Sequence, residues 1–383
     1  MIVKNRGISI YIHIPFCLKK CNYCDFVSFN FKKDEVRKYV EYLNREIFFF
    51  SKKNDLSDLP VSTVYFGGGT PSLLTVNDVE SILLTVQRNF KLLSSAEITL
   101  EANPESIEAK KFKEFRTLGI NRISMGAQSF NDTTLNLLGR IHDADEIYKS
   151  FASLKAAGIN NINIDIMFAL PGETIKDLMH SLKKAVNLDA EHISFYSLLI
   201  ERGTLFYRKR KVLHFPGSDE EAEQYRMGID FLESSGYKHY EISNFSKDNF
   251  QCKHNVTYWK NLPYLGFGVA AGSYYKRKRT RNVLKLDNYY KKLNDNTLPI
   301  GLYEHLKGKK AKGEHIMMNL RLLEGCDKYL YYTRFGSFPV NDFVGEIEFL
   351  SLNGLIEEDE RYIRLTKRGV FLANIVFEQF ITL

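Results

Sequence analysis

Short apolar runs alternate with longer amphipathic stretches from residue 8 to about residue 196. The apolar runs are rich in β-branched and aromatic residues, as strands are, and they are Ile8–Ile14, Thr63–Phe66, Glu97–Glu101, Arg122–Ala127, Asn161–Met167 and His192–Tyr196. Stretches with helical spacing lie between them, at Asp34–Phe49, Val76–Asn89, Ile107–Leu118, Asp143–Ala157 and Thr174–Leu188. Repeated strand–helix units predict an α/β fold with a parallel sheet covered by helices. Six units fit a partial, open (β/α)6 barrel better than a closed eight-stranded barrel.

The pattern changes after residue 200. Residues 201–299 are less regular and rich in aromatic side chains, and we expect them to extend the barrel. In the tail that follows, we expect helices at Glu314–Leu323 and Val340–Leu352, strands at Leu355–Glu357 and Tyr362–Leu365, and a last helix from an N-capping Thr366 to Ile381. This order resembles a winged-helix fold. We therefore predict three domains, at residues 1–200, 201–299 and 300–383.

Polar residues and glycines stand at the carboxyl ends of the predicted strands. The run Gly67–Thr70 follows the second strand, and Glu101 ends the third. Gln128 follows the fourth strand, and Asp165 lies near the end of the fifth. The carboxyl ends of barrel strands converge on one mouth, where barrel enzymes place their chemistry. We therefore expect these residues to share one site.

The composition is that of an ordinary globular protein. Of the 383 residues, 44% are hydrophobic and 26% are charged. No apolar run of about 18 residues is present, so we expect no transmembrane helix. The first six residues lead straight into an apolar run, without signal-peptide architecture. We expect a cytoplasmic protein, in a reducing compartment where thiolates survive.

The formal net charge is +7, and much of the excess lies in short basic runs. These runs are Arg208–Lys211, Lys276–Arg279 with Arg281, and Lys307–Lys312. They are either solvated loops or a surface for an anionic partner, such as nucleic acid, acidic lipid or a propionate-bearing ligand. Composition alone leaves these alternatives open.

Three cysteines near the start of the chain carry the strongest chemical signal. Cys17, Cys21 and Cys24 have the spacing Cys-x3-Cys-x2-Cys, which presents three thiolates on one short loop. A [4Fe–4S] cluster with full cysteine ligation uses four thiolates, so three cysteines imply one open iron. The spacing resembles the signature of the radical S-adenosylmethionine (radical SAM) proteins, in which SAM chelates that iron.

Other uses of these cysteines fit less well. Disulfides are disfavoured because five cysteines is an odd count in a chain without a secretory signal. A zinc site usually shows two Cys-x2-Cys pairs or a pair followed by histidines. Cys252 and Cys326 are isolated and form no second pair. The spacing therefore favours the cluster.

The residues at the strand ends are consistent with a ligand beside that cluster. Gly67-Gly-Gly-Thr70 lets backbone amides approach a ligand closely, as glycines lack a Cβ. Glu101 is suited to accept hydrogen bonds from a ribose or an ammonium group, although a helix-capping acid would look the same. Arg140 is suited to a bidentate contact with a carboxylate, although an ordinary salt bridge would also explain it.

A second group of candidate residues lies in the run from Gln251 to Trp259, which holds the only tryptophan of the chain. His254 offers an imidazole, a common ligand of haem iron. Tyr258 and Trp259 offer flat apolar surface for a macrocycle. The alternative is a core histidine with packing aromatics, which composition alone favours.

Several motifs resemble the oxygen-independent coproporphyrinogen III oxidase family over nearly the whole chain. They are Tyr11–Cys17, Phe66–Leu73, Glu101–Pro104, Gln128–Phe130, Leu170–Gly172, Tyr240–Asn244, Leu320–Leu322 and Leu365–Gly369. Within that family the chain is most similar to the haem chaperone branch. The oxidases carry a further cysteine two residues after the third one, where this chain has Phe26. The haem chaperone branch is marked by His-Asn-x-x-Tyr-Trp, which residues 254–259 match fully.

The resemblance implies ligands for three groups. It implies that Cys17, Cys21 and Cys24 hold a [4Fe–4S] cluster. It implies haem at His254, Tyr258 and Trp259. The residues that match the family's SAM contacts are Tyr11, Gly68, Gly69, Thr70, Glu101, Gln128, Arg140 and Asp165, with Tyr23 beside the cluster.

We therefore expect a haem-binding protein of radical SAM ancestry that delivers haem to a target apoprotein. A membrane-associated recipient, a peripheral membrane location and a homodimer are left open. The first alternative is oxidative decarboxylation of coproporphyrinogen III through a 5′-deoxyadenosyl radical, against which Phe26 counts. The second is radical modification of tRNA, although we do not expect nucleic acid as a partner.

Overall fold

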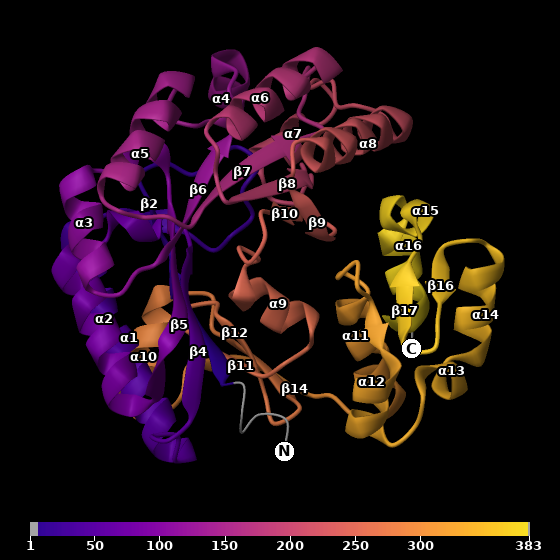
Figure 1. The fold of residues 1–383 in the computed structure, drawn as a ribbon. Coiled ribbons are helices and arrows are strands. Elements are labelled where there is room, and N and C mark those ends of the chain that lie inside the picture. Colours follow the sequence, from indigo (N-terminus) through magenta and orange to yellow (C-terminus); the bar gives the residue numbers. More distant parts are fainter. Residues whose placement is uncertain (1–6, 382–383) are drawn as a thin grey trace.

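The computed structural model describes residues 7–381, so the six residues on which the signal-peptide argument rests lie outside it. Figure 1 shows strands enclosed on one side by helices, with the C-terminal helices gathered in a separate lobe. Within residues 7–381, no helix is both long and apolar enough to cross a membrane.

The six predicted strands form the centre of one sheet, as the sequence predicted. They are β1 (Ile8–Ile14), β4 (Pro60–Gly68), β5 (Lys91–Ala102), β6 (Arg122–Gln128), β7 (Ile162–Phe168) and β8 (His192–Ser197). They pair in parallel and in this order. The carboxyl ends of all six strands therefore lie at one end of the sheet.

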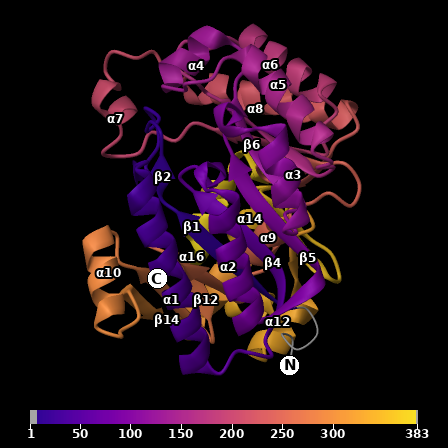
Figure 2. The same ribbon diagram turned by 90° about the vertical axis from the view of Figure 1, so that its left-hand side faces the viewer.

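The predicted helices cover the outer face of these strands. They are α1 (Lys33–Asn54), α2 (Val76–Asn89), α3 (Ala109–Thr117), α5 (Ala144–Ala156) and α6 (Ile175–Asn187). In Figure 2, α1 and α2 lie in front of the strands. Thr75 and Asp78 form a capping box at the start of α2, and Thr174 and Asp177 form one at the start of α6. These caps set where the chain turns from strand to helix.

The pattern did not predict α4 (Asp132–Leu138), a short helix between β6 and α5. The side chain of Asn131 accepts a hydrogen bond from the Thr134 amide and caps its start. Gly139 ends it with a φ of 80°, a conformation that favours glycine. Seven residues are too few to show helical periodicity, which is why the sequence did not reveal this helix.

The sheet continues on both sides of the six strands. Its order is β14-β13-β12-β11-β1-β4-β5-β6-β7-β8-β10-β9, so it remains open. The added strands are β9 (Lys238–Glu241), β10 (Asn244–Ser246), β11 (Tyr264–Phe267), β12 (Gly272–Tyr275), β13 (Lys278–Asn282) and β14 (Ile300–His305). They are too short for alternation to stand out, so residues 201–299 looked irregular in sequence.

The helices of this middle segment are α7 (Leu205–Lys209), α8 (Ser218–Ser234), α9 (Lys253–Trp259) and α10 (Leu286–Asn294). Helix α9 lies between the strands and the C-terminal lobe (Figure 1). It carries the His-Asn-x-x-Tyr-Trp sequence and contacts both β4 and α11 (Gly308–Asn319).

The tail contains most of the elements expected from the sequence, but the helix expected at Val340–Leu352 forms two short helices on either side of Phe343. After α11 it forms β15 (Cys326–Asp327), α12 (Lys328–Phe335), α13 (Pro339–Asp342), α14 (Val344–Leu352), β16 (Ile356–Glu358), β17 (Tyr362–Leu365), α15 (Lys367–Phe371) and α16 (Ala373–Ile381). Thr366 caps α15, its hydroxyl accepting a hydrogen bond from the Gly369 amide at 3.0 Å. The expected last helix is interrupted at Leu372 and therefore forms two helices, α15 and α16.

Backbone hydrogen bonds join the lobe to the barrel. The Ile242 amide donates to the carbonyl of Arg321, and the Leu323 amide donates to the carbonyl of Tyr240, both at 3.1 Å. The boundaries of the three predicted domains stay a prediction.

Candidate cofactor site

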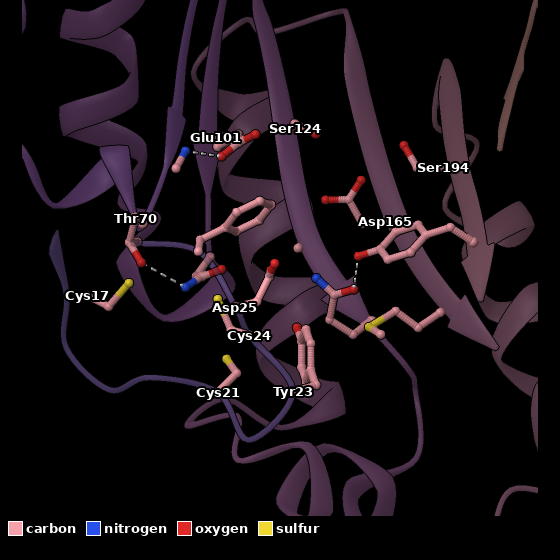
Figure 3. Close-up of a pocket in the computed structure, with 18 of the residues that line it drawn as sticks. Cys17, Cys21, Tyr23, Cys24, Asp25, Thr70, Glu101, Ser124, Asp165 and Ser194 are labelled. Atoms are coloured by element: carbon pink, nitrogen blue, oxygen red, sulfur yellow. Dashed lines mark hydrogen bonds between the residues drawn. The ribbon is translucent and has the colours of Figure 1, made fainter. Parts of the chain in front are cut away.

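A cavity of about 550 Å³ opens at the carboxyl ends of the six parallel strands. This volume falls in the range of roughly 300 to 1,000 Å³ that is usual for ligand sites. Figure 3 shows the three cysteines at one end of the drawn side chains and Glu101, Ser124 and Ser194 at the other. The predicted residues that line it are Cys17, Cys21, Tyr23, Cys24, Gly68, Gly69, Thr70, Glu101, Gln128, Arg140 and Asp165.

The cysteine loop is held from both ends. Cys17 lies in β2 (Phe16–Cys17), which pairs in parallel with β3 (Phe29–Asn30). The tip of the loop is fixed to the end of α4, because the Asn22 amide donates to the carbonyl of Leu138 at 2.9 Å. All three thiols are free and partly exposed. The loop therefore presents three potential ligands to one space.

Partial burial makes two of these thiols less acidic. Loss of hydration raises the pKa of the Cys17 thiol and raises that of the Cys24 thiol to about 11. Only the thiolate ligates metal, so each thiol has to lose its proton when a cluster binds. The positive charge of the iron favours this deprotonation. A guanidinium nitrogen of Arg140 already lies 3.4 Å from the sulfur of Cys21.

The glycine run brings backbone close to the cysteine loop. The Gly69 amide donates to the carbonyl of Ile14 at 2.8 Å. A Cβ on Gly69 would lie 2.7 Å from the carbonyl oxygen of Phe16, so no larger residue fits without a shift of the backbone. Gly68 has a φ of 117°, which L-residues rarely adopt. The fold therefore requires glycine at 68 for its backbone conformation and at 69 for lack of space.

Glu101 is fixed by two hydrogen bonds at the wall of the cavity. Its carboxylate accepts from the Gly68 amide at 2.9 Å and from the Tyr65 hydroxyl at 2.8 Å. Burial raises the pKa of Glu101 to about 7. Burial also raises the pKa of Asp165, which accepts from the Asn163 side-chain amide at 2.6 Å. Two carboxyl groups thus face a region suited to hydroxyl or ammonium donors.

Gln128 and Arg140 are held in fixed positions beside them. Gln128 has a φ of 71°, an uncommon conformation for a non-glycine residue, and its side-chain oxygen accepts from the Tyr196 hydroxyl at 2.8 Å. Arg140 donates to Asn103 at 2.7 Å and to the carbonyl of Gly126 at 2.8 Å. The Nε of Arg140 is buried without a partner. A buried donor without an acceptor at the edge of a cavity is consistent with an anionic group of a ligand.

The donors around the cavity fit the two cofactors that the sequence predicts. Three free thiols on one loop match the three protein ligands of an open cluster. Beside them lie two carboxyl groups and Arg140, which match an amino acid joined to a ribose. The amides of Gly68 and Gly69 donate within the protein, so the glycine run contributes close approach of the backbone rather than free donors.

Tyr11 is the one predicted SAM residue that does not line the cavity. Its hydroxyl hydrogen-bonds Nδ1 of His13 at 2.9 Å, and its ring stacks on Tyr65 at 6.3 Å between centroids. A Cβ on Gly67 would lie 3.0 Å from the Tyr11 ring. Tyr11 therefore packs against the glycine run without lining the cavity.

His254 lies outside the cavity, and both of its ring nitrogens are already bonded. Nδ1 hydrogen-bonds the Thr63 hydroxyl at 2.7 Å, and Nε2 hydrogen-bonds the Tyr258 hydroxyl at 2.8 Å. The residue is 1% exposed, and burial lowers its pKa to about 3. Haem ligation by this imidazole would have to break one of these bonds, because neither ring nitrogen is free in this arrangement.

The other aromatic residues of α9 are also engaged in packing. Tyr258 packs edge-on against Tyr264 at 4.5 Å between ring centroids. The guanidinium of Arg321 lies over the ring of Trp259 at 4.2 Å from its centroid. Trp259 thus joins α9 to the C-terminal lobe, and the structure does not bring it together with the cysteines.

Several residues that line the cavity were not predicted as site residues. They include Lys19, Lys20, Phe26, Ser124, Asn163, Ser194, Leu199 and Asn255. Ser124, Asn163 and Ser194 lie one strand position or more inside the strand ends, so alternation along the strands could have found them. Asn255 comes from α9, whose seven residues gave no periodicity from which to deduce its direction.

Comparison with known proteins gives two matching domain families. The radical SAM superfamily matches residues 11–185, and the HemN C-terminal domain family matches residues 312–372. The first match runs from within β1 to within α6 and includes the cysteine loop, and the second covers most of the C-terminal lobe.

Curated relatives align over nearly the whole chain. The "Heme chaperone HemW" of Bacillus subtilis is 36% identical over 376 residues, which cover 97% of this chain and 99% of that protein. The protein of the same name from Escherichia coli is 31% identical over 396 residues, covering 99% of this chain and all of that protein. Among solved structures, the coproporphyrinogen III oxidase HemN of Escherichia coli superposes with a TM-score of 0.86 at 23% identity, covering 98% of this chain and 90% of that one.

Proposed function

The chain belongs to the HemW family of radical SAM proteins, and from this premise we propose that it binds haem and delivers it to an acceptor apoprotein. The observation that carries the proposal is the cavity in which three free cysteines meet a glycine run and two buried carboxyl groups, in a chain whose relatives are named haem chaperones.

Cys17, Cys21 and Cys24 would hold a [4Fe–4S] cluster. Tyr23, Gly68, Gly69, Thr70, Glu101, Gln128, Arg140 and Asp165 would hold SAM, with Tyr11 supporting them. When bound, the cluster supplies an electron-transfer centre and an open iron that accepts an amine and a carboxylate. The protein's own part is to orient the ligand, because Tyr65 and the Gly68 amide fix Glu101 in one position.

Phe26 supports delivery of haem over oxidation of coproporphyrinogen. It stands where the oxidases carry a further cysteine, and its side chain lines the cavity while remaining 61% exposed. A phenyl ring there supplies apolar contact area and no thiol chemistry. HemN shares the fold, and at 23% identity this likeness concerns the fold alone.

Haem binding followed by transfer is the direct test. The anaerobically reconstituted protein is titrated with haemin, and the loaded protein is then mixed with apomyoglobin as a model acceptor. We expect a saturable 1:1 change of the Soret band, followed by appearance of the holomyoglobin spectrum. Absence of saturable binding would refute the proposal.

A second measurement separates the chaperone from the oxidase. The same preparation is incubated anaerobically with coproporphyrinogen III, SAM and a reductant, and the products are separated by chromatography. We expect no protoporphyrinogen IX. Conversion at many turnovers per chain would replace the chaperone with the enzyme.

A further inference from the structure

The helix that carries His-Asn-x-x-Tyr-Trp offers haem little to bind. His254 is buried, its two nitrogens are bonded to Thr63 and Tyr258, and its ring stacks on Tyr65 at 4.9 Å between centroids. The hydroxyl of Tyr65 in turn holds Glu101 in the cavity wall. His254 is therefore placed to position a cavity residue and offers no free nitrogen to haem iron.

Two large apolar side chains are exposed where the cavity opens. Phe26 projects from the cysteine loop and is 61% exposed, and Leu199 follows β8 and is 65% exposed. Both line the cavity although they belong to segments more than 170 residues apart. Exposed apolar side chains that line the same cavity offer apolar surface to a ligand there.

Positive charge lies beside this apolar pair. The ammonium of Lys20 donates to the carbonyl oxygen of Phe26 at 3.0 Å, and Lys19 also lines the cavity. Asp25 and Glu201 line it too, so the anionic groups of a ligand are attracted to the lysines and repelled by these two carboxylates.

A basic run flanks the same loop. Helix α7 packs on the cysteine loop, because the Phe206 amide donates to the carbonyl of Asn22 at 3.0 Å and the Phe206 ring lies 6.5 Å from that of Tyr23. The helix continues into Arg208–Lys211, where all four side chains are exposed. This basic run is therefore adjacent in sequence to a helix that is hydrogen-bonded to the cysteine loop.

We propose that haem docks at this cavity mouth, defined by Lys19, Lys20, Phe26 and Leu199, with its macrocycle on the two apolar side chains and its propionates toward the lysines. The inference rests on the proposed function and adds the place where the cargo binds. A flat apolar ring with two carboxylates at one edge matches an apolar pair bordered by ammonium groups. The loop that holds the cluster then also forms one side of the haem site.

Substitution of the apolar pair tests the macrocycle contact. We expect the double variant Phe26→Ser with Leu199→Ser to weaken haemin binding at least about tenfold in Kd. Both side chains are largely exposed, so the fold does not depend on them. Leu352→Ser is the matched control, since Leu352 is 81% exposed in the C-terminal lobe and lies outside the cavity.

Substitution of the lysines tests the propionate contact. The variant Lys19→Gln with Lys20→Gln should bind haemin more weakly than the wild type. Haemin dimethyl ester, which lacks free carboxylates, should bind both proteins alike. A loss that is equal for haemin and its ester would contradict the placement of the propionates.

Protection of the thiols gives an independent readout of position. Cluster-free protein is treated with iodoacetamide, with and without metal-free protoporphyrin IX, and labelling is followed by mass spectrometry. We expect the porphyrin to slow labelling of Cys17, Cys21 and Cys24 by about fivefold, since reactivity follows access. Cys252 and Cys326 are buried and serve as unlabelled references. Unchanged labelling rates would overturn the site.

The outcomes separate this inference from the proposed function. If the wild-type protein does not bind haemin, both the proposed function and the haem site at the cavity mouth are refuted. If the wild type and the Phe26 and Leu199 variant bind haemin equally well, only the haem site at the cavity mouth is refuted. Loss of haemin binding in His254→Asn, with the Phe26 and Leu199 variant unaffected, would return the haem site to α9.

Discussion

The cysteine loop and helix α9 both resemble metal-ligand motifs in sequence, yet the structure places them in opposite situations. The thiols of the loop are free and face a cavity. The imidazole of His254 is buried, and both nitrogens have hydrogen-bond partners within 2.8 Å. A residue type suited to ligation becomes a candidate ligand only when the fold leaves it facing an open space and without strong hydrogen-bond partners.

The difference follows from what each side chain needs when it is buried. A thiol is a weak hydrogen-bonding group, so contacts such as that between the Cys21 sulfur and Arg140 at 3.4 Å are given up at little cost when the sulfur ligates a metal. A neutral imidazole carries one donor and one acceptor, and burial without partners for them is costly. Thr63 and Tyr258 supply those partners, and they make His254 part of the packed interior of the barrel.

The largest contrast is expected from removing single candidate ligands. Alanine at Cys17, Cys21 or Cys24 should remove nearly all iron and sulfide from the reconstituted protein, because two thiolates hold a cubane cluster poorly. Cys326→Ala should keep the wild-type iron content, since that thiol is buried in the C-terminal lobe. Iron and sulfide per chain, with the visible spectrum, measure the effect. Equal loss from Cys326→Ala would mean that folding, rather than ligation, explains the result.

His254→Ala should act on stability rather than on haem. The change removes two buried hydrogen bonds and leaves a cavity, and we expect the free energy of unfolding to fall by about 3 kcal/mol. Urea unfolding measures this loss. His214→Ala is the control, because His214 is exposed and should leave stability within about 0.5 kcal/mol of wild type. Undiminished stability in the His254 variant would contradict its role in packing.

The pH dependence of stability sharpens the contrast further. Burial lowers the pKa of His254 from 6.5 to about 3, so its contribution is present above pH 6.5 and is lost as the pH falls toward 3. As the pH falls through that window, the free energy of unfolding of both proteins changes. The wild type should lose about 1.4 kcal/mol more per pH unit than His254→Asn.

The wild type has to be compared with His254→Asn because other groups change the free energy of unfolding with pH in the opposite direction. Burial raises the pKa of Glu46 and Glu101 to about 7 and that of Glu173 to about 8, and their contribution is lost as the pH rises through these values. These groups are the same in both proteins, so they cancel in the difference. Parallel pH profiles for the two proteins would contradict a neutral, buried His254.

The smallest effect is expected at the outer end of α9. Trp259→Leu removes the aromatic face beneath Arg321, and we expect a loss of about 0.5 to 1 kcal/mol in unfolding free energy at the contact with the C-terminal lobe. The double-mutant cycle with Arg321→Met isolates the pair. An interaction energy near zero would mean that the two side chains merely lie beside one another.

Much of the barrel could be predicted because each of its strands is buried and regular. The strand Ile8–Ile14 was predicted to the residue, as was Tyr362–Leu365 in the C-terminal lobe. The helix starts at Thr75 and Thr174 follow from local capping. The strands β9 to β14 could not be predicted, since runs of three to six residues carry too little alternation. Their pairing depends on neighbours that are distant in sequence.

The sequence by itself determined the cysteine spacing, the glycine run and the order of polar residues at the strand ends, because these depend on local geometry and on the parallel direction of the strands. Only the tertiary structure decided which of the candidate ligands are free. It bonded both nitrogens of His254, turned Asn255 to the cavity and placed Phe26 and Leu199 in the lining of the same cavity. Whether a lone pair is available depends on residues far away in the chain, such as Thr63 for His254, and only folding brings them together.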